Sequence, residues 1–155
     1  MFPSTKFRSK EEEIMDDLES EGYVLTDSLD YISRINQLLG GNGITVKAVK
    51  SLLNNRDKSA TYRIVDIGCG NGDMLRALAR WGRKNKYNLE LVGVDANKAA
   101  INHAIHLSKD YPEISYQVQD VLVPSYPSED YDITLFTLCL HHFEDEVALA
   151  LLKRV

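Results

Sequence analysis

The fold of this chain is decided by the stretch YRIVDIGCGNGD, which runs from Tyr62 to Asp73. Residues 64–67 are largely apolar and rich in β-branched side chains, a composition that is typical of a buried strand. Three glycines follow at alternate positions, and apolar residues at helical spacing begin at Met74. The stretch therefore predicts a strand, a glycine-rich turn and a helix. Such a turn lets a polar ligand approach the backbone beside a helix N-terminus.

Outward from this unit, strands and helices alternate along the chain, which predicts an α/β fold with a parallel sheet. Two helices are expected to precede the sheet, at 28–39 and 45–53. Asp27 or Ser28 is expected to cap the first helix, and Gly40 and Gly41 to end it. Residues 1–10 are expected to form a loose arm and 11–17 a short helix. The remaining elements are expected as strands at 62–67, 88–94, 114–118 and 131–138, helices at 73–84, 98–108 and 144–154, and a loop at 124–128.

The composition of the chain argues against several classes of binding partner. The 155 residues suit one domain, and a net charge of −5 argues against a general basic surface for nucleic acid or an acidic membrane. No apolar stretch approaches the roughly 20 residues of a membrane helix, and the N-terminus lacks the apolar core of a signal peptide. A cytoplasmic location is therefore expected. The cysteines, Cys69 and Cys139, form no CxxC pair, so buried thiols are expected and no metal site.

Three acidic residues lie at the carboxyl ends of three successive expected strands. Asp66 precedes the glycines, Asp95 ends the second strand and Asp120 ends the third. Open α/β sheets bind ligands at this edge. Asp66 suits a ligand that carries a cation, and it is a poor neighbour for a pyrophosphate. Asp95 fits ribose hydroxyls, although it or Asn97 could instead cap the next helix. Asp120 fits an exocyclic amine.

The spacing of the glycines differs from that of a dinucleotide-binding turn. Gly68, Gly70 and Gly72 read GxGxG, whereas a dinucleotide-binding turn reads GxGxxG. A GxxxxGK[ST] phosphate loop is absent from the sequence.

Together, residues 65–72, 92–95, 119–120 and 131–143 resemble the class I S-adenosylmethionine-dependent methyltransferases, and most closely their small-molecule group, which includes quinone-biosynthesis enzymes. The resemblance covers about residues 61–155. It implies that Asp66 lies near the methionine amino group, Asp95 at the ribose and Asp120 with Val121 at the adenine, with Ala96 and Leu122 as apolar neighbours. The implied cofactor-binding residues are Asp66, Gly68, Cys69, Gly70, Gly72, Asp95, Ala96, Asp120, Val121 and Leu138.

The resemblance also sets expectations for the architecture. It implies a Rossmann-like sheet that holds the first four strands of a seven-stranded fold, in the order 3-2-1-4. Residues 1–60 are then a lid-like N-terminal region, and residues 61–155 a cofactor-binding domain whose C-terminal part is missing. The apolar fourth strand would make an uncomfortable bare edge, so a second copy or further chain is expected to cover it.

The expected function is methyl transfer from S-adenosylmethionine to a small-molecule acceptor. His141 and His142 follow the fourth strand and are candidates for a base, although packing or capping also explains them. His103 and His106 are expected at the surface. A cofactor-binding fragment or inactive module remains an alternative, and a nicotinamide-dependent oxidoreductase is a further one, which the GxGxG spacing and Asp66 disfavour.

Overall fold

The computed structural model describes residues 22–123, 126 and 130–154. The arm expected at 1–10, the helix expected at 11–17 and most of the loop expected at 124–128 lie outside these residues. The described elements are α1 (Tyr23–Leu39), α2 (Gly41–Leu53), β1 (Thr61–Ile67), α3 (Asp73–Asn85), β2 (Asn88–Asp95), α4 (Lys98–Leu107), β3 (Ile114–Val118), β4 (Ile133–Leu135), the 3₁₀ turn η2 (Leu140–His142) and α5 (Asp145–Leu152).

The four strands form one parallel sheet in the order β3-β2-β1-β4. Val65 of β1 is in register with Val92 of β2 on one side and with Thr134 of β4 on the other. This confirms the predicted Rossmann-like α/β fold and its strand order. Because the strands are parallel, their carboxyl ends meet at one edge of the sheet.

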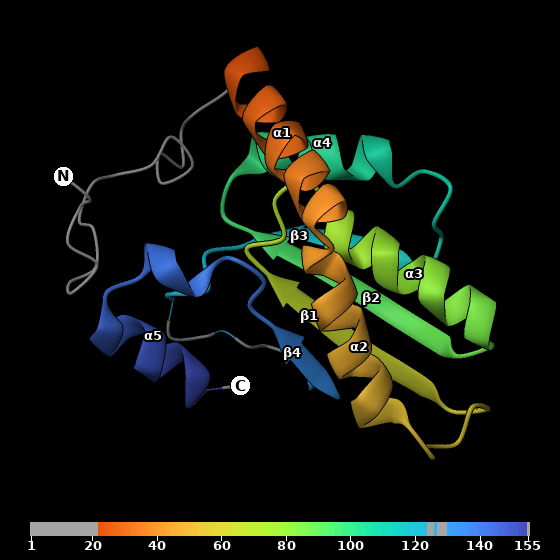
Figure 1. Cartoon of the computed structure of the whole chain (residues 1–155). Coiled ribbons are helices and arrows are strands. Elements are labelled where there is room, and N and C mark those ends of the chain that lie inside the picture. The colour runs from red at the N-terminus through yellow and green to blue at the C-terminus, as the bar shows by residue number, and fades with distance from the viewer. Residues whose placement is uncertain (1–21, 124–125, 127–129, 155) are drawn as a thin grey trace, which may run out of the picture.

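Successive strand residues bury themselves on opposite faces of the sheet. Ile64 and Leu91 belong to a core that also holds Val49 and Leu53 of α2. Val65 and Val92 belong to a second core, which Leu151 of α5 completes. Figure 1 shows α3 and α4 on one side of the sheet and α5 on the other. The N-terminal helix α2 thus shares a core with the strand that decides the fold.

The N-terminal helices differ from their expected boundaries. Helix α1 begins at Tyr23, so Asp27 and Ser28 lie inside it and do not cap it. The Ser28 hydroxyl instead donates to the Val24 carbonyl at 2.8 Å. Gly40 ends α1 in a left-handed conformation, with φ 75°, as expected, but α2 begins directly at Gly41. The starts of α1 and α2 have no side-chain cap hydrogen bond, so the capping signals in the sequence do not mark them.

The fourth strand is shorter than expected. Only Ile133–Leu135 pairs with β1, and the apolar residues that follow turn into η2. Of these residues, Phe136 and Cys139 pack against the second core, whereas Leu138 is 56% exposed. Among the described residues, β4 forms one edge of the sheet.

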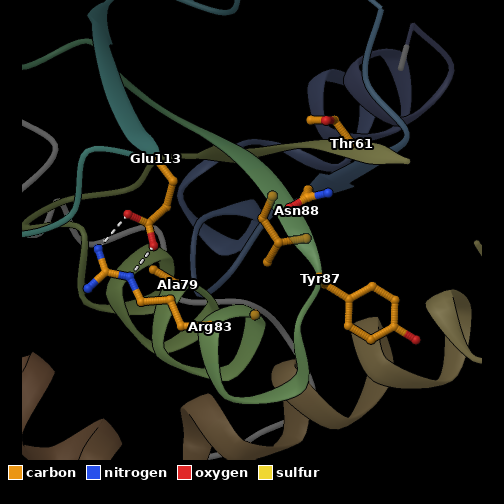
Figure 2. A pocket seen from close by; sticks show the side chains of 8 residues that line it. Thr61, Ala79, Arg83, Tyr87, Asn88 and Glu113 are labelled. Carbon is orange, nitrogen blue, oxygen red and sulfur yellow. Dashed lines mark hydrogen bonds and ion pairs between the residues drawn. The ribbon is translucent and has the colours of Figure 1, made fainter. Parts of the chain in front are cut away.

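A cavity of about 350 Å³ lies at the amino ends of β1 and β2, where Thr61 and Asn88 begin the two strands. Figure 2 shows it bordered by Arg83, which holds Glu113 through two ionic hydrogen bonds of 2.6 and 2.7 Å. It is therefore at the opposite end of the sheet from the glycine turn. None of the helices in the described part of the chain is long and apolar enough to cross a membrane.

Candidate cofactor-binding site

The glycine turn joins β1 to α3 at the carboxyl edge of the sheet. Gly68, Gly70 and Gly72 have φ values of 68°, 51° and 75°, which L side chains rarely adopt. The amides of Gly68 and Cys69 both donate to the Val94 carbonyl, at 2.8 and 3.1 Å. The turn is thus fixed to the end of β2, and its alternating glycines are required by its backbone conformation.

Gly68 also allows the segment after β4 to pack closely against the turn. A Cβ at this position would collide with the Cys139 thiol, which follows β4. A Cβ at Gly70 would lie 3.2 Å from Leu29 Cδ2 of α1. The turn is therefore enclosed by segments from both sides of the chain, and only glycine fits between them.

Asp66 is the buried acid at the centre of the site. Its side chain is 2% exposed, and its Oδ1 has no hydrogen-bond partner among the described residues. Burial raises the pKa of Asp66 to about 8, and the negative charge of Asp73 adds to the shift. Thr137, which follows β4, opposes the shift but only in part. An unpaired buried carboxyl of this kind is costly to the free protein and suits a cationic partner.

Asp95 ends β2 and faces the glycine turn. Its Oδ2 accepts a hydrogen bond from the Gly70 amide at 2.9 Å, and its Oδ1 accepts one from the Asn97 amide at 2.9 Å. Burial raises the pKa of Asp95, while these two amides oppose the rise. Asn97, and not Asp95, caps α4, because its side chain accepts from the amides of Ala99 and Ala100 at 2.8 and 3.0 Å. Ala96, between the two, is half-buried.

The segment after β3 holds the predicted adenine side. Asp120 is exposed, and its Oδ1 accepts from the Leu122 amide at 2.8 Å within the same loop. Val121 is buried in the second core, whereas Leu122 is 47% exposed. Sequence analysis missed Arg154, whose guanidinium donates to the carbonyls of Val121, Val123 and Tyr126 and so fastens this loop to the end of α5.

The segment after β4 holds the remaining predicted residues. Leu138 is 56% exposed and has a left-handed φ of 54°, a strained conformation for a γ-branched residue. His141 is exposed and His142 is half-buried, and their ring centroids are 4.0 Å apart. The charge of His142 is close enough to Asp95 to lower the pKa of that carboxyl, which places the two residues on the same side of the site.

Both cysteines are buried, as predicted. Cys69 is 6% and Cys139 is 7% exposed. Burial raises the pKa of the Cys69 thiol well above its usual value, and raises that of Cys139 to about 12. Asp95 and Asp66 add to both shifts, so the thiols and the two acids share one neighbourhood. Neutral thiols of this kind shape the site and are poor nucleophiles.

Four residues of the site's surroundings carried no signal in the sequence. Asn71 within the turn is buried, and its amide donates to Asp30 of α1 at 2.9 Å. His103 of α4, expected at the surface, is half-buried and contacts the same Asp30 oxygen at 2.9 Å, whereas His106 is exposed as expected. Asn42 of α2 donates to Asp73 at 2.8 Å. These contacts join segments far apart in sequence, so no local sequence pattern could predict them.

The acids give the site a negative field. The charges of Asp73 and Asp95 both raise the pKa of Asp66, so the three carboxyls lie close together. No group of three or more histidines, cysteines or acids in the described residues could hold a metal ion. The field therefore favours an organic cation over a phosphate group.

Comparison with known proteins places the chain in a family. A family model described as a methyltransferase domain matches residues 64–155. The chain is 30% identical over 77 residues to a carboxy-S-adenosyl-L-methionine synthase from a Nitratiruptor species, covering 49% of this chain and 31% of that protein. It is 36% identical over 79 residues to the EEF1A lysine methyltransferase 2 of Danio rerio, covering 50% and 32%. The chain thus matches about a third of the length of each of these relatives.

The fold is also that of solved methyltransferases. The structure of the plantazolicin methyltransferase BpumL in complex with SAH superposes with a TM-score of 0.63 at 23% identity, covering 83% of this chain and 46% of that one. A likeness at this identity shows the fold, whereas the family model shows descent. The chain belongs to the methyltransferase-domain family.

Proposed function

We propose that this chain binds S-adenosylmethionine at the carboxyl edge of the sheet and serves methyl transfer to a small-molecule acceptor. The observation that carries the proposal is the Asp66 Oδ1 atom, buried and without a hydrogen-bond partner among the described residues. A carboxyl whose pKa is raised to about 8 by burial needs a cation or a donor beside it, and the amino group of the cofactor is both. The residues present therefore fit the group.

The other residues complete the site. Gly68 and Gly70 supply the left-handed backbone that the turn requires, and Cys139 and Leu29 pack where their side chains would lie. The Asp95 carboxylate lies beside Gly70 and can accept hydrogen bonds from ribose hydroxyls. The amide of Val121 and the carboxylate of Asp120 are assigned to the adenine, with Ala96 and Leu122 as apolar neighbours. Cys69, Gly72 and Leu138 border the ligand.

When bound, S-adenosylmethionine supplies a methyl group that is activated by its sulfonium charge. The chain's own residues hold and orient it. Asp73 and Asp95 supply negative charge that favours the cationic ligand, and the Asp66 carboxyl ionises beside the ammonium group of the ligand. An acceptor hydroxyl would also need to lose its proton. His142, half-buried on the Asp95 side, is a candidate base, and His141 beside it is the alternative.

A nucleic-acid acceptor is disfavoured by the chain's charge. A net charge of −5 offers no basic stripe for nucleic acid. The name of the Danio rerio relative assigns that protein a lysine acceptor, so a protein acceptor is the competing assignment. The cytoplasmic location and the division into a lid-like region of residues 1–60 and a cofactor domain of residues 61–155 remain proposals of the same kind.

Titration calorimetry of the purified chain tests the cofactor assignment. S-adenosylhomocysteine, the demethylated product, is expected to bind in the micromolar range, and NAD is expected not to bind. Binding of NAD in place of S-adenosylhomocysteine would overturn the assignment in favour of an oxidoreductase. Transfer of labelled methyl groups to a panel of small molecules and to lysine peptides then tests the acceptor class. Cofactor binding without transfer to any acceptor would support the alternative of a binding module.

A further inference from the structure

Asp30 of α1 joins three elements that are distant in sequence. Its Oδ1 accepts a hydrogen bond from the Asn71 amide at 2.9 Å and contacts His103 Nε2 at 2.9 Å. Asn71 lies in the glycine turn between β1 and α3, and His103 lies in α4. One carboxylate oxygen therefore holds α1, the glycine turn and α4 together.

Asn71 transmits this contact to the backbone of the turn. The side-chain Oδ1 of Asn71 accepts a hydrogen bond from the Asp73 amide at 3.2 Å. The backbone carbonyl of Asn71 accepts one from the Arg76 guanidinium at 2.5 Å. The Asn71 side chain is thus held by α1 at one end and by the first turn of α3 at the other. The side chain is only 4% exposed, so water does not replace these partners.

The turn needs such support because of its glycines. Gly70 and Gly72 flank Asn71 and lie in the left-handed region, and glycine restricts its own backbone less than any other residue. Leu29, the neighbour of Asp30, packs directly over Gly70. Contacts from outside the turn must therefore select the conformation in which its amides and the space above it face the ligand.

The charge of Asp30 suits this role. Partial burial alone would raise its pKa, but the hydrogen bonds from His103 and Asn71 outweigh it and leave the pKa of Asp30 below its usual value. The carboxylate is ionised at neutral pH, and a charged acceptor forms a stronger hydrogen bond than a neutral one.

We propose that Asp30 is a positioning residue, which acts through Asn71 to hold the glycine turn in the conformation that receives the amino-acid part of the cofactor. This inference rests on the proposed function. A merely structural role, in which Asp30 only fastens α1, is the alternative. The two roles differ in which part of the ligand loses affinity. The turn is assigned to the amino-acid part, whereas the loop assigned to the adenine is held by its own contacts, from the Leu122 amide to Asp120 and from Arg154 to the Val121 and Val123 carbonyls.

The test compares two ligands and two variants. S-adenosylhomocysteine carries the amino-acid part, and 5′-methylthioadenosine lacks it. Asp30→Asn is expected to raise the Kd for S-adenosylhomocysteine roughly tenfold, the scale for loss of a hydrogen bond to a charged group. The Kd for 5′-methylthioadenosine is expected to change less than about twofold on the same scale. Asp27→Asn removes the same charge from an exposed position on the same helix and is the matched control, expected to change neither Kd.

A second pair of variants keeps the test valid if Asp30→Asn folds poorly. His103→Gln retains a hydrogen-bond donor for Asp30, whereas His103→Leu removes it. Only His103→Leu is therefore expected to weaken the binding of S-adenosylhomocysteine more than that of 5′-methylthioadenosine. Equal losses for both ligands, in step with a lower Tm, would overturn the positioning role, and so would unchanged affinities in Asp30→Asn and His103→Leu. Failure of the unmutated chain to bind S-adenosylhomocysteine would instead overturn the proposed function itself.

Discussion

The Asp95 carboxylate accepts a hydrogen bond from the Gly70 amide at 2.9 Å, across the carboxyl edge of β1 and β2. The same carboxylate also holds the Asn97 amide, at the start of α4. One side chain therefore sets the relative positions of the glycine turn and of the next crossover. Burial raises the pKa of Asp95, so a ligand of the turn that carries a hydrogen-bond donor or a positive charge favours its ionised form.

Replacement of Asp95 by asparagine should weaken cofactor binding more than it weakens the fold. The amide retains an acceptor for one of the two backbone donors, but it loses the charged acceptor proposed for the ribose. We expect the Kd for S-adenosylhomocysteine to rise about tenfold or more, on the scale of a charged hydrogen bond. Glu90→Gln, an exposed acid on the same strand, should leave the Kd unchanged. Calorimetry measures both, and an unchanged Kd in Asp95→Asn would remove the residue from the site.

Asp66 should make the free protein less stable as pH rises. Below pH 3.8 the carboxyl is protonated in the folded and unfolded states alike. Between there and about pH 8 the unfolded chain releases a proton that the folded chain retains, so the free energy of unfolding falls with pH. Asp66→Asn should remove this pH-dependent loss of stability. Relative to the unmutated chain, its free energy of unfolding should be higher by on the order of a few kcal/mol at pH 7 and little changed at pH 4.

Urea unfolding of the free chain at pH 4, 6, 7 and 8 measures this dependence. Asp110→Asn, an exposed acid, is the control and should leave the pH dependence as it is in the unmutated chain. An Asp66→Asn chain that is less stable at pH 7 than at pH 4 by the same margin as the unmutated chain would contradict the assignment of the pH dependence to Asp66.

Cofactor binding should release a proton. In the free protein at pH 7 the Asp66 carboxyl, with a pKa of about 8, is mostly protonated. The ammonium group of the ligand favours the carboxylate and lowers that pKa, so affinity should rise with pH up to about 8, by at most about tenfold per pH unit. Calorimetry in buffers of different ionisation enthalpy counts the protons. Binding of S-adenosylhomocysteine with no proton release at pH 7, or release that persists in Asp66→Asn, would rule out this coupling.

The glycines of the chain should differ in their tolerance of alanine. Gly68→Ala forces a left-handed φ on alanine and drives its Cβ into Cys139, so we expect a loss of about 2–4 kcal/mol in unfolding free energy. Gly43→Ala is the matched control, because it lies in α2 with open space around its Cβ position, and should gain about 0.5 kcal/mol. Thermal melting compares the two. Equal Tm values for both variants would show that Cys139 and the turn adjust freely.

That a second copy or a further chain covers the edge formed by the fourth strand stays a prediction. Only Ile133–Leu135 pairs in the sheet, and these residues are half-buried among the described ones. Three paired residues make a short edge, which is itself one way in which proteins limit edge-to-edge association.

Local sequence determined the elements and the turn. Residues 62–73 predicted a strand, three glycines with positive φ and a helix, and the structure has all of these, because each depends on neighbours a few residues away. The alternation of strands and helices predicted the parallel sheet, and the family resemblance implied the strand order that the structure has. The helix starts were predicted less well, because α1 and α2 begin without a side-chain cap.

Tertiary structure decided what surrounds the turn. Asp66 was recognised from its place in the sequence, but only burial beside Asp73 and Asp95 raises its pKa to about 8 and leaves Oδ1 without a partner among the described residues. Asp30 meets Asn71 across 41 residues of sequence and His103 across 73, distances over which no spacing pattern carries information. The glycines that open the site could thus be predicted from the chain itself. The contacts that hold them in place could not, because only the folded chain brings α1 and α4 to the turn.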